Sequence, residues 1–332
     1  MNHLCGSRAA EILQVYQIGI SECYKTWDWK EKYPSHLELK AYFKHVEQTL
    51  DLAKDMLYDH TVVSATFDES SNRWNIKCDK GTTISAALFV TCIGFAAKRH
   101  YPDWPGLQDF KGTLCHSSYW PHDLRLEGKR IGVVGTGATG IQLSQQVARE
   151  AKHLTCFVRT PNLAFPMQQC QVGSKNAPRE SGESLDYLLR DKRYTTGAGF
   201  LFPTPTKNMF DDSPEEITRV LDAAYDIGGF LPAAAYIDIT TDPKAGDFAY
   251  EHWQKRTARR MKNPVKRDLL VPKVKPHLWA GKRPSLEQDY YEQVCLQHPM
   301  SPRSRPCLAR TLTSPLPHSD GQGPRNPCRR QK

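Results

Sequence analysis

The chain has 332 residues, of which 39% are hydrophobic, and a formal net charge of +9. This length supplies enough apolar material for one large or two ordinary domains. Residues 301–332 carry seven arginines and lysines and one aspartate, so only about +3 of the charge belongs to the rest of the chain. The charge therefore does not favour a body that binds nucleic acid, although a basic tail that binds acidic partners or RNA stays an alternative function.

The ten cysteines are scattered, without a CxxC pair or histidines at ligand spacing. We therefore expect free thiols, no metal site and no disulfide framework. Cys92, Cys115 and Cys156 lie in or beside apolar strands and are expected to be buried. No run of about 18 apolar residues could span a membrane, and residues 1–25 lack the features of a signal peptide. These observations predict a cytoplasmic protein.

The first predicted elements are a helix and three strands. Ser35-His-Leu-Glu38 is a capping box, and the apolar residues that follow at helical spacing are expected to be core: Leu39, Tyr42, Phe43, Val46 and Leu50. Residues 61–67, 73–78 and 82–90 alternate with turn sequences, which predicts a three-stranded meander. The third strand runs on to Gly94, where we expect it to stop.

A glycine-rich turn follows further along the chain. The apolar run from Ile131 to Val134 enters it, and a helical pattern that reaches Ala151 leaves it. A GxGxxG between strand and helix lets the backbone approach a pyrophosphate at the helix N-terminus. The first glycine allows the tight turn, the second leaves space for the pyrophosphate to approach the backbone, and the third allows the helix to pack closely on the strand. The cofactor-binding residues predicted here are Gly135, Thr136, Gly137, Thr139 and Gly140.

The second strand of this unit, residues 154–158, ends in Arg159 and Thr160. An NAD site places a carboxylate at this strand end, roughly 20 residues past the glycines, to accept from the ribose 2′-hydroxyl. A cation at that position suits a 2′-phosphate instead. We therefore predict that Arg159 and Thr160 bind NADPH in preference to NADH. The alternative is that Arg159 is an ordinary solvated arginine at a strand end.

The residues before the glycines are more specific. Phe110-x-Gly112-x-x-x-His116-x-x-x-Trp120-Pro121 resembles the fingerprint of Baeyer–Villiger monooxygenases, flavoproteins that insert one oxygen atom from O2 beside a ketone carbonyl. The resemblance continues through Trp27-Asp-Trp29, Arg159-Thr160-Pro161-Asn162 and Gly281-Lys282-Arg283-Pro284, over residues 25–295. N-oxygenating flavin monooxygenases usually lack the Trp-Pro ending. The resemblance implies that His116 and Trp120 lie in a loop that couples two domains.

The resemblance implies an α/β fold. A Rossmann-like NADP-binding domain is expected at residues 110–298, with a helical insertion at 163–280, and partial FAD-domain elements (the helix and the meander) at 1–109. Within the insertion, Ser213-Pro-Glu-Glu216 predicts a helix start, and residues 247–262 predict a helix with a solvated basic face. Recurring prolines without periodic apolar runs predict a disordered tail at 299–332.

The resemblance also implies the chemistry. The cofactors are expected to be FAD and NADPH, and the substrates a ketone and O2, with oxygen transferred through a peroxyflavin. Lys282 corresponds to the second ligand of the 2′-phosphate, and Arg283 to the catalytic arginine over the flavin. The alternative for this pair is a surface basic doublet. Secondary metabolism, with terpenoid or polyketide ketones, fits the family; no oligomeric state is predicted.

No GxGxxG precedes Gly135. The resemblance therefore implies that the chain starts after the flavin fingerprint and the active-site aspartate of the family. Two further functions stay open for this reason. One is a catalytically incompetent NADP-binding fragment, and the other is an N- or S-oxygenating flavin monooxygenase.

Overall fold

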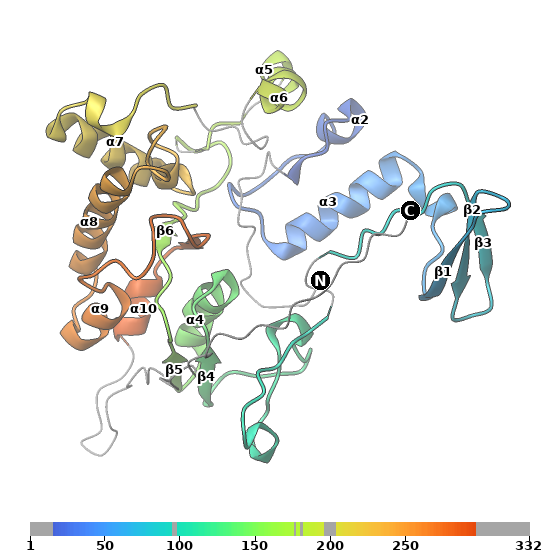
Figure 1. The fold of residues 1–332 in the computed structure, drawn as a ribbon, viewed down its shortest axis with the longest axis horizontal. Coiled ribbons are helices and arrows are strands. Elements are labelled where there is room, and N and C mark those ends of the chain that lie inside the picture. Colours follow the sequence, from blue (N-terminus) through green and yellow to red (C-terminus); the bar gives the residue numbers. More distant parts are fainter. Residues whose placement is uncertain (1–15, 95–97, 176, 180–181, 196–203, 297–332) are drawn as a thin grey trace, which may run out of the picture.

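A computed structural model describes residues 16–94, 98–175, 177–179, 182–195 and 204–296 of the chain (Figure 1). The tail predicted at 299–332 lies outside the described residues. Figure 1 shows a small β-meander at one end of the molecule and a group of helices, α7 to α9, at the other. The strands β4 and β5, with helix α4, lie between these two ends.

Helix α3 (His36–Thr49) begins as the sequence predicts. The Ser35 hydroxyl accepts a hydrogen bond from the backbone N–H of Glu38 at 3.2 Å. The predicted core positions Leu39, Tyr42 and Val46 are buried, but Phe43 is 44% exposed, so that prediction was wrong. The helix packs on a small cluster that contains Cys23 and Trp29. This cluster covers only part of the apolar face that the sequence pattern predicts for the helix.

The meander consists of β1 (Val62–Asp68), β2 (Arg73–Cys78) and β3 (Thr83–Ala86), paired antiparallel in that order. The third strand stops at Ala86, so the prediction that it continues to residue 90 was wrong. Residues 87–94 have no strand partner among the described residues. For this reason Cys92, expected to be buried, is exposed; Cys115 is half-buried, and only Cys156 is buried as predicted.

The Rossmann-like unit is confirmed in the order strand, helix, strand. It comprises β4 (Arg130–Val134), α4 (Ala138–Glu150) and β5 (His153–Phe157). The two strands are parallel, with Arg130 opposite His153 and Val134 opposite Phe157. A second parallel pair, β6 (Ala164–Pro166) with β7 (Ser285–Glu287), joins segments that lie far apart in the sequence. Helix α10 (Tyr290–Leu296) follows β7 directly.

The insertion is helical, as predicted. Its longest helices are α7 (Pro214–Ile227), α8 (Pro243–Arg259) and α9 (Pro264–Leu270), and the Ser213 hydroxyl accepts from the backbone N–H of Glu216 at the start of α7. The short helices are α2 (Ser21–Tyr24), α5 (Gly182–Asp186), a π-helical turn at Tyr187–Lys192, and α6 (Arg193–Thr195). None of the described helices combines the length and apolarity needed to cross a bilayer.

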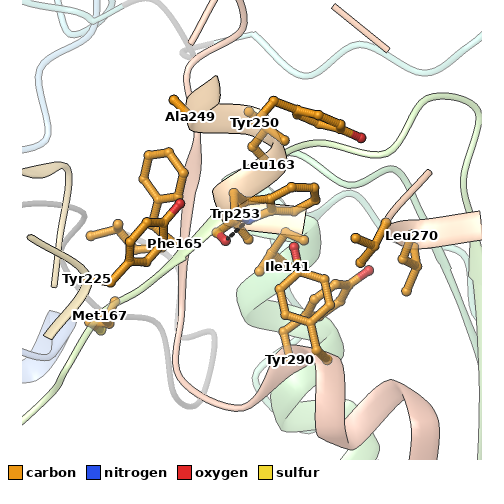
Figure 2. Packing of buried hydrophobic residues seen from close by; sticks show 14 of the residues in the cluster. Ile141, Leu163, Phe165, Met167, Tyr225, Ala249, Tyr250, Trp253, Leu270 and Tyr290 are labelled. Atoms are coloured by element: carbon orange, nitrogen blue, oxygen red, sulfur yellow. Dashed lines mark hydrogen bonds between the residues drawn. The ribbon is translucent and has the colours of Figure 1, made fainter. Parts of the chain in front are cut away.

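Aromatic side chains of the insertion form the main core with the sheet. Trp253 of α8 is 1% exposed, and its indole N–H donates to the carbonyl of Ala164 in β6 at 3.0 Å (Figure 2). Phe165 lies next to Tyr225 of α7 in the same cluster, with ring centroids 5.9 Å apart. Burial of these large side chains fixes the insertion on β6.

A buried ion cluster holds the end of β7. The carboxylate of Glu287 is fully buried and accepts two hydrogen bonds from the Arg260 guanidinium, at 2.6 and 3.0 Å. Arg260 also contacts Glu292 at 2.6 Å, and Glu287 accepts from the backbone N–H of Tyr290. Burial raises the pKa of Glu287, while Arg260 acts in the opposite direction. Arg260 therefore supplies the compensating charge that this carboxylate needs.

Arg260→Ala is expected to lower the free energy of unfolding by about 3–5 kcal/mol, because it leaves a buried carboxylate without its partner. Arg259→Ala is the matched control, since Arg259 is the exposed neighbour on the same helix turn. Urea denaturation followed by circular dichroism measures both. Equal losses for the two variants would contradict the assignment of Arg260 as the essential partner.

His252 of α8 is a second titratable group in this part of the core. Its Nε2 lies 3.0 Å from Oδ1 of Asp222 in α7, and its side chain is 11% exposed. Arg256 and Lys255 add positive charge nearby. Burial lowers the pKa of His252 and outweighs the attraction of Asp222. The pKa of His252 is therefore lower in the folded chain than in the unfolded chain, so folding favours the neutral ring.

The stability of the chain is expected to fall as the pH drops below about 6.5, the ordinary pKa of histidine, because the unfolded state then takes up a proton more readily. His252→Gln should reduce this loss between about pH 6.5 and 5. Urea titrations at several pH values test the expectation. An unchanged slope in the variant would show that other groups cause the pH dependence.

Candidate functional site

The turn between β4 and α4 has the geometry that a dinucleotide pyrophosphate needs. Gly135 has φ +100°, a left-handed conformation that favours glycine. A Cβ on Gly140 would lie 2.3 Å from the carbonyl oxygen of Gly135, so helix and strand pack closer here than any side chain allows. Gly137 is the N-cap of α4, and a Cβ there would meet nothing within 4 Å. The open N-terminus of α4 therefore fits a phosphate group.

The two threonines of the motif differ in their surroundings. Thr136 is 9% exposed, and its hydroxyl donates to the carbonyl of Thr160 at 3.2 Å. This bond fixes the turn to the segment that follows β5. Thr139 is exposed in the first turn of α4. Both were predicted to bind the cofactor; the side chain of Thr136 is engaged inside the protein, whereas that of Thr139 is open to solvent.

The predicted 2′-phosphate ligands lie on two loops that the structure joins. Arg159 follows β5 and Lys282 precedes β7, and both side chains are exposed. Between them, the Asn162 amide donates to the carbonyl of Arg283 at 3.1 Å and to the Ser285 hydroxyl at 3.2 Å. The loops that carry the two cations are thus held together although more than a hundred residues separate them.

Asn162 is a positioning residue for which the sequence analysis gave no role. Its position at the end of Arg159-Thr160-Pro161-Asn162 was the available signal, because a side-chain amide just after a strand can satisfy the backbone of a neighbouring loop. The backbone N–H of Ser285 also donates to the carbonyl of Leu163 at 2.9 Å. This pairing continues directly into the parallel strands β6 and β7.

Arg283, the predicted catalytic residue, lies against the insertion. Its guanidinium carbon is 5.4 Å from the ring centroid of Phe230, which stands between α7 and the turn at Leu231–Ala233. The arginine side chain is exposed. Its backbone is fixed by Asn162, so the loop presents this cation from a constrained position.

The segment that carries the fingerprint is a loop, as predicted. His116 is the N-cap of a 3-10 turn at Ser117–Tyr119, and its Nδ1 accepts from the backbone N–H of Ser118 at 3.1 Å. Its ring lies 5.8 Å from that of Tyr101. These contacts give His116 a structural role within the loop.

A cavity of about 540 Å³ lies away from the glycine turn, between α7, α8 and the start of α10. Tyr225, Arg256, Arg260 and Glu292 are among its lining residues, and none of the predicted cofactor residues is. Two of its arginines are engaged, since Arg256 pairs with Asp222 and Asp226, and Arg260 pairs with Glu287 and Glu292. Among the described residues, no three His, Cys, Asp or Glu side chains are grouped as metal ligands.

Residues 30–33 are tied to residues 169–172 by strand-like pairing. Lys32 N–H donates to the carbonyl of Cys170, and Val172 N–H to that of Lys30. The Gln169 side chain bonds to both the N–H and the carbonyl of Tyr33, each at 3.0 Å. Gln169 therefore acts as a substitute peptide group that holds residues 30–33 in register.

Comparisons with known proteins agree with these features. Residues 17–169 match the family model described as flavin-binding monooxygenase-like. The FAD-binding monooxygenase acrE of Aspergillus aculeatus is 37% identical over 290 residues, which cover 87% of this chain and 49% of that protein. Cyclopentanone 1,2-monooxygenase of a Comamonas species is 36% identical over 289 residues, 86% of this chain and 52% of that enzyme.

A solved structure of an oxidized steroid monooxygenase bound to NADP is similar to this chain, with a TM-score of 0.77 and 30% sequence identity. The match covers 88% of this chain and 55% of that one. The chain spans about half the length of the curated relatives it matches. The resemblance inferred from the motifs is confirmed: residues 17–169 match the flavin-binding monooxygenase-like family, and most of the chain is similar to monooxygenases of that kind.

Proposed function

We propose that this chain acts as an FAD- and NADPH-dependent monooxygenase of the Baeyer–Villiger type, on a ketone and O2. The observation that carries the proposal is the close-packed glycine turn together with the Asn162 contacts that join the loops of Arg159 and Lys282. A ketone substrate is supported by the name of the Comamonas relative, cyclopentanone 1,2-monooxygenase.

The proposed roles follow from the geometry. Backbone N–H groups at the N-terminus of α4 would bind the pyrophosphate, and Arg159 with Lys282 would bind the 2′-phosphate. Residues 110–298 would form the NADP-binding domain, with the insertion at about 163–280, and residues 1–109 would contribute to the FAD domain. The Asn162 contacts would set the position of the Lys282 loop relative to Arg159.

Bound FAD would supply the oxygen chemistry, which amino-acid side chains alone do not perform. Arg283 would contribute a positive charge that cannot be lost by deprotonation, because a guanidinium stays protonated throughout the working pH range. Its loop is fixed by Asn162 and its side chain lies against Phe230, so this charge would be held in place.

Supplying the purified chain with FAD, NADPH and cyclopentanone tests the proposal. O2 uptake with formation of the lactone, dependent on all three additions, is the expected result. The second candidate, a nucleotide-binding portion without activity of its own, is favoured by the half-length match to the relatives. It would be supported by a colourless protein that binds NADPH and takes up no flavin.

Gly140→Ala is expected to lower both stability and NADPH affinity. The added Cβ must move α4 away from the Gly135 carbonyl, at an overpacking cost of about 1–3 kcal/mol. Gly137→Ala separates the two effects, because its Cβ meets no protein atom within 4 Å and lies at the open helix end. The melting temperature should therefore fall much less than in Gly140→Ala, by the cost of a poorer N-cap alone, while NADPH binding weakens. Calorimetric titration and thermal denaturation measure both; unchanged binding in both variants would remove the turn from the cofactor site.

Arg159→Ala and Lys282→Ala are each expected to weaken NADPH binding by about 10- to 100-fold, the value of a charged hydrogen bond to phosphate. NADH binding should change little, because NADH has no 2′-phosphate. Lys152→Ala is the matched control, since Lys152 is an exposed lysine just before the start of β5. Fluorescence titrations of the three variants with both nucleotides measure the effect. Equal losses for NADPH and NADH would contradict the assigned roles.

A further inference from the structure

The C-terminal end of α7 is held by a lysine from the N-terminal part of the chain. The ammonium group of Lys32 donates to the carbonyl of Ile227, the last residue of α7, at 2.7 Å, although the two residues are 195 positions apart. Helix α7 has no basic residue in its own last turn. The last carbonyl groups of a helix lack partners within the helix and carry a partial negative charge, so a cation is favourable there. Lys32 therefore supplies the positive charge that α7 itself lacks.

The ammonium group of Lys32 has little freedom to move. Lys32 is only 8% exposed, and a buried ammonium group is costly unless it is hydrogen-bonded, so it depends on the Ile227 carbonyl. Burial lowers the pKa of Lys32, while Cys170 acts in the opposite direction. The backbone N–H of Lys32 donates to the carbonyl of Cys170 at 3.0 Å. The side chain is thus fixed at its backbone and at its tip.

Two glycines, Gly228 and Gly229, form the turn that follows α7. Their φ angles are +84° and +71°, both left-handed. A Cβ on Gly228 would lie 2.6 Å from the Gln168 side chain, and a Cβ on Gly229 would lie 2.4 Å from the Tyr33 hydroxyl. The backbone N–H of Gly229 donates to the carbonyl of Pro166 at 2.9 Å. The turn is therefore packed closely between Tyr33, the neighbour of Lys32, and the end of β6.

Phe230 comes directly after this turn and contacts the predicted catalytic arginine. Its ring centroid lies 5.4 Å from the guanidinium carbon of Arg283. A guanidinium group over an aromatic ring is attracted by the electron-rich face of the ring. The Asn162 amide holds the backbone of Arg283 by its carbonyl at 3.1 Å, whereas the Arg283 side chain is exposed. The position of the Phe230 ring therefore bears directly on where the guanidinium group lies.

We propose that Lys32 is a positioning residue for Arg283. By holding the last carbonyl of α7, it fixes the start of the glycine turn, and the turn places the Phe230 ring against which the Arg283 guanidinium lies. The inference rests on the proposed function in one respect, because that function makes Arg283 the cation that acts in the reaction. The contacts themselves lie within the chain and require neither flavin nor NADPH.

NMR of the chain with isotope-labelled arginine tests the proposal, because an aromatic ring shifts the signals of protons held above its face. Arg283→Lys identifies the δ-methylene signal of Arg283 by its loss. Phe230→Leu should return this signal to the position of an arginine in a flexible peptide. Lys32→Met should move it at least halfway to the same position, because the turn is then no longer held and the ring leaves the guanidinium group.

Three further variants complete the test. Lys30→Met is the matched control, because Lys30 is exposed and its ammonium group pairs with Asp28, so the signal should not move. Lys32→Gln is too short to hold the α7 carbonyl and carries the same expectation as Lys32→Met, so the test does not depend on the folding of one variant. Tyr42→Phe controls for a general loss of stability, because it removes the hydrogen bond from the backbone N–H of Ile18 in the separate cluster beside α3.

An Arg283 signal that stays in place in the folded Lys32 variants, or that moves equally in Tyr42→Phe, would overturn the proposal. A signal that Phe230→Leu leaves unchanged would also overturn it, because the ring would then not lie against the guanidinium group. No flavin or NADPH is added, so the result does not depend on oxygenation of a ketone. A chain that shows the expected shifts but no oxygenation would count against the proposed function alone.

Discussion

The structure of the site depends on the close approach of helix α4 to strand β4 at Gly140. This approach brings the N-terminus of α4 against the carbonyl of Gly135, at a distance that leaves no room for a Cβ. Two further contacts fix the same turn to β5 and to the residues after it. The backbone N–H of Gly135 donates to the carbonyl of Phe157, and the Thr136 hydroxyl donates to the carbonyl of Thr160. The residues after β5, including Arg159, take their position from this arrangement.

The middle and the C-terminal end of α4 fix the segment that follows β7. The buried Gln145 side chain accepts from the backbone N–H groups of Gln288 and Asp289, at 2.8 and 3.0 Å. Arg149 adds a two-pronged contact to Asp289, with both distances at 2.7 Å. Because β7 ends immediately before these residues, one helix sets the position of both β5 and the strand that follows Lys282. The candidate phosphate site is therefore built from a single rigid element and the two loops beside it.

Local features of the site were predictable from sequence, and long-range ones were not. The glycine turn and the helix starts at Ser35 and Ser213 are decided within a few residues, and all are confirmed. The β6–β7 pair and the Asn162 contacts were missed, because three-residue strands carry little pattern and their partners lie far away in sequence. Phe43 and Cys92 were wrongly predicted to be buried for a related reason. An apolar pattern shows which face of an element can be buried, but it does not show which other element packs on that face.

The candidate nucleotide site is held in place by contacts within the chain, at the glycine turn and between the loops of Arg159 and Lys282. The central claim is that the glycine turn and the two joined loops select the phosphorylated nicotinamide dinucleotide. Equilibrium titration of the wild-type chain with NADPH and NADH, followed by nicotinamide fluorescence, tests it most directly. The account predicts that NADPH binds at least about tenfold more tightly, as expected for a phosphate held by charged hydrogen bonds. Equal affinity for the two nucleotides would contradict it.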